Sequence, residues 1–187
     1  MARALPAAAR DGRDGGSSPA PEEEARSPGF GHDLTITLGG GLGTRDFYCH
    51  GCSHGGGISP LIKISRFVGA TTAVGIEATT VSKHAGPSGA TMWSAMAVFT
   101  GYVIDHSPFF VSGGLGVVGF HQTDGLAPSV GGTGFGCTGR LGYEARISSA
   151  LALTPYAGYV STIGGLQTAD TRQALSAFQF GLGLTLR

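Results

Sequence analysis

A short segment rich in cysteine and histidine, Cys49-His50-Gly51-Cys52-Ser53-His54, is the densest group of reactive side chains in the chain. Thiolates and imidazoles at this spacing can ligate zinc or copper. The two cysteines can instead close a small disulfide, Cys49–Cys52, which an oxidising exterior favours. We expect the disulfide and keep Cys49, Cys52, His50 and His54 only as secondary metal candidates, so no cofactor is expected.

Five charged residues form the second candidate group: Lys63, Glu77, Arg140, Glu144 and Arg146. Each lies in a run where apolar residues alternate with polar or small ones. If the run that contains Lys63 and the run that contains Glu77 are joined by a turn centred on Ala70, hairpin pairing sets the two residues directly across from each other. Buried charges must be paired, so we expect these five residues to form an ion-pair network inside the protein, with a structural and not a catalytic role.

The composition describes an uncharged, glycine-rich chain. Of 187 residues, 34 are glycine, 41% are hydrophobic and 13% are charged, and the formal net charge is zero. This balance gives no electrostatic basis for binding nucleic acid. Nine of the 24 charged residues lie in residues 1–30, so the remainder of the chain is nearly uncharged.

Residues 1–30 differ from the rest of the chain. They mix Ala, Pro, Gly and Ser with both signs of charge and have no apolar periodicity, so we expect a disordered segment. No export signal is visible in it, because Leu5 is the only large aliphatic residue before Leu34. We expect one folded domain over residues 31–187.

From Leu34 onward the apolar residues recur with a period of two, which is typical of β-strands. We expect eight strands, at residues 33–43, 58–68, 71–82, 92–104, 109–121, 134–147, 150–161 and 175–186. The connections alternate in length. Those at 44–57, 83–89, 122–133 and 162–174 are predicted to be long polar loops at one end of the fold, and short turns are expected at the other.

The polar face of these strands indicates which side meets water. It consists mainly of Gly, Ser, Thr and Ala with about five charges, whereas a water-exposed face normally carries many Lys and Glu. Small residues suit the crowded interior of a narrow barrel whose apolar side faces lipid. The fold expected is therefore all-β: a closed, antiparallel, up-and-down, eight-stranded transmembrane barrel. A transmembrane helix over 85–104 is the weaker alternative, because its apolar part begins only at Met92.

The chain resembles the small eight-stranded outer-membrane β-barrel proteins, of the OmpA-like and OmpX-like kind, over about Gly31 to Arg187. The resemblance rests on LTITLGGGLG from Leu34, the Gly75-Ile76-Glu77 run, FFVSGGLGV from Phe109, GRLGYE from Gly139 and the closing FQFGLGLTL. It implies a place in the outer membrane of a diderm bacterium. Such barrels commonly end on an aromatic residue, whereas this chain ends Leu186-Arg187.

Three functions remain open on the sequence alone. The leading hypothesis is a monomeric outer-membrane barrel with a structural or surface-interaction role, surrounded by membrane lipid, meeting an extracellular partner through its long loops and forming no large pore. The second is a soluble lipocalin-like carrier, which would turn Leu34, Ile36, Phe178 and Phe180 inward around an apolar ligand. The third is a lipid-modifying enzyme using His121. We expect no enzyme.

Overall fold

The computed structural model describes residues 34–47, 55–85, 88–103, 108–124, 127–167 and 172–187. The segment predicted to be disordered, residues 1–30, and the candidate disulfide and metal ligands Cys49, His50, Cys52 and His54 lie outside these residues. Those predictions therefore stay predictions. Among the described residues, no helix has the length and apolar character needed to cross a membrane.

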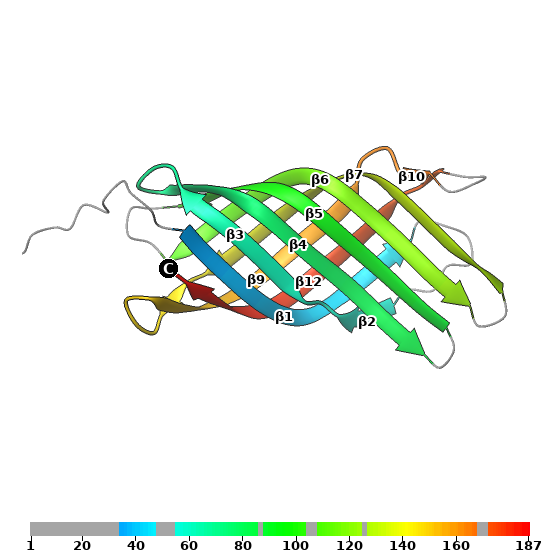
Figure 1. The fold of residues 1–187 in the computed structure, drawn as a ribbon, viewed down its shortest axis with the longest axis horizontal. Coiled ribbons are helices and arrows are strands. Elements are labelled where there is room, and N and C mark those ends of the chain that lie inside the picture. Colours follow the sequence, from blue (N-terminus) through cyan, green and yellow to red (C-terminus); the bar gives the residue numbers. More distant parts are fainter. Residues whose placement is uncertain (1–33, 48–54, 86–87, 104–107, 125–126, 168–171) are drawn as a thin grey trace, which may run out of the picture.

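The chain forms a closed antiparallel β-barrel with eight strand positions around its wall (Figure 1). We call these positions staves, because two of them are each made of two consecutive strands. Six staves are single strands: β1 (Leu34–Phe47), β4 (Thr72–Ala85), β5 (Ser88–Tyr102), β6 (Phe109–Asp124), β9 (Leu151–Thr162) and β12 (Leu175–Leu186). The other two are each interrupted, into β2 (Gly55–Ile58) with β3 (Leu61–Phe67) and β7 (Ala127–Tyr143) with β8 (Ala145–Arg146). Pairing of β1 with β12 closes the barrel. The predicted fold class is confirmed.

The hairpin of β3 and β4 has the register predicted from the sequence. Lys63 pairs with Glu77, as expected for a turn centred on Ala70. The gap between β2 and β3 falls at Ser59-Pro60, where proline has no N–H to donate to the ladder. The gap does not shift the pairing, because Ile58 and Leu61 face β1 and β4 in one continuous register.

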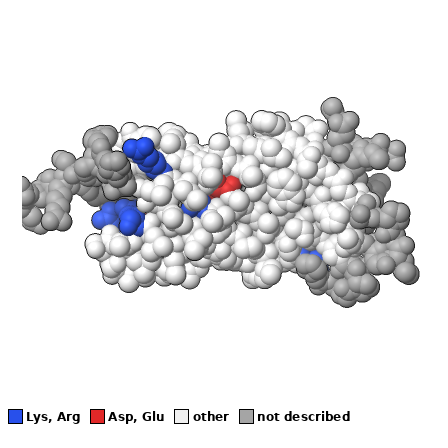
Figure 2. All heavy atoms as spheres, viewed as in Figure 1, with Lys and Arg blue, Asp and Glu red and all other residues white. Residues whose placement is uncertain are grey.

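The barrel's outer surface is apolar. Leu34, Phe178 and Phe180 are 53%, 40% and 57% exposed, and 24 other large hydrophobic side chains among the described residues are exposed with them. Most of the face in Figure 2 is uncharged: Lys and Arg are seen mainly at its left-hand end, and only small areas of acidic and basic atoms appear near the middle and at the lower right. The lipocalin-like alternative is therefore wrong, because it needs these side chains to point inward, and a soluble protein could not expose so large an apolar surface.

Aromatic side chains mark both limits of this apolar belt. Phe109 and Tyr143 pack edge to face, with ring centroids 4.8 Å apart, near the end where the short turns and Arg187 lie. We call this the short-turn end; it is on the left in Figure 1. Trp93, the only tryptophan of the sequence, lies near the opposite end, which we call the extended end. Aromatic girdles of this kind are typical of barrels spanning a bilayer.

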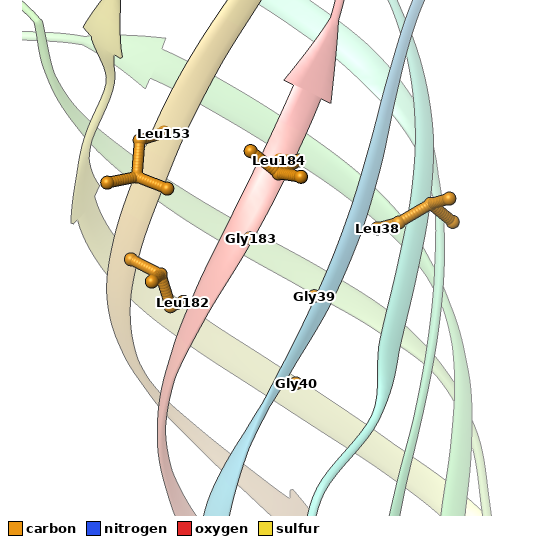
Figure 3. A pocket seen from close by; sticks show the side chains of 7 residues that line it. All are labelled: Leu38, Gly39, Gly40, Leu153, Leu182, Gly183 and Leu184. Carbon is orange, nitrogen blue, oxygen red and sulfur yellow. The ribbon is translucent and has the colours of Figure 1, made fainter.

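A shallow groove interrupts the belt where β9, β12 and β1 lie side by side (Figure 3). It has a volume of about 440 Å³ and is lined by Leu38, Gly39, Gly40, Leu153, Leu182, Gly183 and Leu184. The groove exists because Gly40 carries no side chain among outward-facing leucines. Its apolar lining suits the acyl chains of a bilayer.

Two of the predicted long loops are wrong, because the strands continue through them. β4 and β5 pair as far as Ala85 with Ser88, and β6 and β7 as far as Asp124 with Ala127. Outside the apolar belt both faces of a strand meet water, so the alternation that revealed the strands is lost there. The connection predicted at 162–174 also contains structure: β10 (Leu166–Gln167) pairs with β11 (Arg172–Gln173).

Candidate functional site

One buried ion pair crosses the middle of the barrel. Arg140 of β7 places Nη2 2.7 Å from Oε1 of Glu77 on β4, and the two side chains are 3% and 1% exposed. Gln179 of β12 accepts a longer hydrogen bond from the same Nη2, at 3.4 Å, and donates to Thr79 Oγ1 at 3.0 Å. Charged and amide groups from three separated staves thus meet on the barrel axis.

Glycine makes the space that the Arg140 guanidinium occupies. A Cβ added to Gly158, which pairs with Arg140 across β7 and β9, would lie 3.2 Å from Arg140 Cζ. On the other side the guanidinium lies over the Tyr156 ring, with Cζ 4.6 Å from the centroid. The arginine is held between a bare strand and an aromatic face, so its position is fixed by packing as well as by charge.

Several buried polar atoms around this pair have no hydrogen-bond partner within the described residues: Glu77 Oε2, Ser94 Oγ, Arg140 Nε, Arg140 Nη1 and Tyr156 Oη. Buried polar groups in folded proteins are almost always satisfied by protein or by water. The described residues therefore leave several hydrogen-bonding positions around the ion pair unfilled.

A second charged cluster lies at the short-turn end. Glu144 accepts a hydrogen bond from the Tyr102 hydroxyl at 2.8 Å and forms an ion pair with Arg187. The Arg187 guanidinium lies over the Phe67 ring, which stacks on Tyr102. The sequence analysis did not single out Arg187. Continuing the alternation of β12, in which Leu184 and Leu186 point outward, would have placed Arg187 on the inner face.

The five charged residues expected in one network thus occupy different places. Glu77 and Arg140 meet at the centre, Glu144 lies in the cluster at the short-turn end, and Arg146 is exposed on β8. Lys63 is in neither group. It donates a hydrogen bond to Thr100 Oγ1 at 2.7 Å, and its ammonium lies 5.4 Å from the Phe110 ring centroid. Although Lys63 and Glu77 are paired in register, the ion pair recorded for Glu77 is with Arg140.

This arrangement predicts a modest effect of Lys63→Met. The variant removes the donor to the Thr100 hydroxyl but leaves Glu77 paired with Arg140, so the loss should be about 1 kcal/mol of unfolding free energy. Urea titration of the protein folded in lipid vesicles, followed by Trp93 fluorescence, measures it. A loss as large as that caused by removing Arg140 would mean that Lys63, and not Arg140, neutralises Glu77.

The extended end presents a different surface. Beyond Trp93 the outward positions become polar, with His121 exposed opposite Thr91 and Gly131. Ser82 and Thr91 share a hydrogen bond of 3.2 Å between their hydroxyls. Among the described residues no group of His, Cys, Asp or Glu could hold a metal ion. The neighbours of His121 give the lipid-modifying alternative no support.

One sheet edge at this end lacks a second hydrogen-bonded ladder partner among the described strands. β7 pairs with β6 along nearly its whole length, but its pairing with β9 begins only at Gly136. Residues 127–133 of β7 therefore form an edge without a ladder partner on that side among the described strands, which we call the free edge (Figure 1). β10 lies close to the start of this edge, since a Cβ added at Gly134 would lie 3.1 Å from Gly165 O. The backbone N–H and C=O groups along such an edge can pair with another strand.

Comparison with known proteins finds the same architecture at low sequence identity. No family model and no curated protein matches the chain. The crystal structure of Neisserial surface protein A (NspA) matches with a TM-score of 0.63 and 12% identity, over 82% of this chain and 96% of that one. The fold is that of the small eight-stranded outer-membrane barrels. Such barrels present an apolar belt to lipid, as this chain does.

A second outer-membrane barrel of this fold is Ail, the attachment invasion locus protein of Yersinia pestis. It matches with a TM-score of 0.58 and 12% identity, over 82% of this chain and 97% of Ail. Ail in complex with the heparin analogue sucrose octasulfate gives a TM-score of 0.53 at 9% identity. At these identities the likeness defines the fold of the barrel and not its ligand.

Proposed function

We propose that the protein is a monomeric surface-interaction barrel of the outer membrane, with its extended end outside the cell and its short-turn end in the periplasm. The observation that carries the proposal is the free edge of β7 at residues 127–133, beyond the apolar belt. An exposed edge of this kind recognises an extended peptide by adding it as a further strand.

The edge has features that suit such a partner. Ile163 N donates to Phe135 O at 2.7 Å, so the polar backbone groups of Phe135 point away from β6. Because these groups alternate along a strand, those of Thr133 and Gly131 point the same way. Val130 is exposed beside them, and Gly131 and Gly132 carry no side chain to obstruct a partner's backbone.

Sulfated glycans are a less suitable partner than an extended peptide. Ail has been crystallised with a heparin analogue, and a ligand of that kind requires clustered basic groups. The described rim side chains of β4–β7 include Lys83 and the exposed His121, which is a low positive charge for this purpose. The proposal therefore rests on backbone pairing and not on charge.

Thr133→Pro tests the proposal. Proline removes the N–H that faces the free edge but leaves the pairing with β6, because the Thr133 backbone groups do not point toward β6. We expect wild-type protein, folded in detergent, to bind a subset of short unrelated peptides on an array, and Thr133→Pro to lose that binding. Thr133→Ala keeps the N–H and is the matched control. Equal binding by the two variants, or no peptide bound by the wild type, would refute strand addition at this edge.

A further inference from the structure

The half of the barrel interior nearer the extended end is packed with apolar side chains. Ten buried residues form one cluster there: Val81, Met92, Met96, Val98, Val118, Phe120, Val160, Leu166, Leu175 and Ala177. They come from β4, β5, β6, β9, β10 and β12 and so span the barrel. Inward-facing residues of a water-filled membrane barrel are normally polar, so this cluster is out of place in a conduit.

Two staves, β1 and β7, contribute no side chain to the cluster, and glycines on them let valines of the cluster pack against their backbones. A Cβ added at Gly43 of β1 would lie 2.8 Å from Val81 Cγ2, and one added at Gly136 of β7 would lie 2.3 Å from Val118 Cγ2. The valines therefore pack directly on these backbones. The apolar layer reaches the wall at β1 and β7 without leaving a gap for water.

Leu166 belongs to the cluster although its strand, β10, is not part of the barrel wall. It is 2% exposed and belongs to β10, in the connection that follows β9. Gly164 and Gly165, with φ of 76° and 78°, allow the sharp bend that returns the chain over the barrel mouth. A Cβ added at Gly134 would lie 3.2 Å from Leu166 Cδ2, so the leucine lies against β7 at the level where β9 has ended.

We propose that this cluster is a watertight seal, which Leu166 of β10 completes, between the extended end and the polar interior around Glu77 and Arg140. Water and ions do not enter a narrow apolar constriction, because they would lose their hydrogen bonds there. The extended end then offers no path for water or ions into the barrel. This inference is independent of strand addition at the β7 edge.

A cysteine below the seal provides the test. Ser112→Cys, in a full chain whose three native cysteines are replaced by alanine, places a thiol on the inner face of β6 near Thr100. The protein is reconstituted in phosphatidylcholine vesicles, and a charged methanethiosulfonate reagent is added from one side. Thr123→Cys and Ser148→Cys, in separate samples, report which end faces the reagent.

We expect Ser112→Cys to stay unreactive from the extended end of the folded protein and to react once the protein is unfolded in urea, which shows that the thiol is competent. Adding Leu166→Ser should raise the rate from the extended end about tenfold or more, equivalent to lowering the barrier by about 1.4 kcal/mol. Leu166→Met conserves volume and should stay closed. If Leu166→Ser does not fold, Met92→Ser opens the same layer from β5. Reaction of Ser112→Cys from the extended end without either change, or no increase with them, would overturn the proposal.

Discussion

Replacing Arg140 with methionine is expected to lower the free energy of unfolding by about 3–5 kcal/mol, because the Glu77 carboxylate is then buried without a counter-charge. The two side chains are almost fully buried, so solvent cannot screen the remaining charge. Urea titration in lipid vesicles, with Trp93 fluorescence as the signal, measures the loss.

A second variant separates the unpaired charge from lost packing. Arg140→Met combined with Glu77→Gln removes both charges, and replacing a whole buried pair is often nearly neutral. The double variant should therefore recover most of the stability lost in Arg140→Met. A double variant no more stable than the single one would attribute the loss to the packing of Arg140 against Tyr156 and Gly158.

The same substitution at two adjacent glycines of β1 should have opposite effects. A Cβ at Gly41 would lie 1.8 Å from Phe180 O and 2.5 Å from Gly181 Cα, both backbone atoms of β12. Gly41→Ala must therefore force β1 and β12 apart, where they close the barrel, at a cost of about 1–3 kcal/mol or more. A Cβ at Gly40 meets nothing within 4 Å.

Gly40→Ala is thus the matched control, and it should stabilise the protein by about 0.5–1 kcal/mol because alanine has less freedom to lose on folding. Migration of unheated samples in detergent gels shows whether each variant folds, and urea titration gives the difference between them. Equal stability of the two alanine variants would mean that β1 and β12 approach less closely than the structure indicates.

The sequence carried enough information to predict the barrel, because each strand inside the belt has one face in lipid and one in the interior. Phe178, Phe180 and Leu182 alternate with Gln179 and Gly181 for this reason, and the Lys63–Glu77 register followed from the turn alone. The extended parts of β4–β7 were read as loops because water meets both of their faces, so nothing in their composition alternates.

The interior was only partly predictable. Its charged residues stood out individually, but which of them pair depends on barrel closure, which brings Arg140 of β7 to Glu77 of β4. The polar face was described as small and charged, whereas Met92, Met96 and Phe120 share it near the extended end. Where apolar residues face inward as well as outward, the period-two alternation is lost, so the sequence pattern did not reveal the apolar cluster.

Closure of the barrel by its first and last strands also affects how the chain folds. Ile36 is paired with Leu186 and Phe47 with Leu175, so the seam joins residues from opposite ends of the sequence. Bringing such distant segments together costs chain entropy that only the completed ladder repays. The hairpins from β3 to β7 are local and can form early. Until β1 meets β12 the sheet has two open edges, so this seam is the step at which folding competes with aggregation.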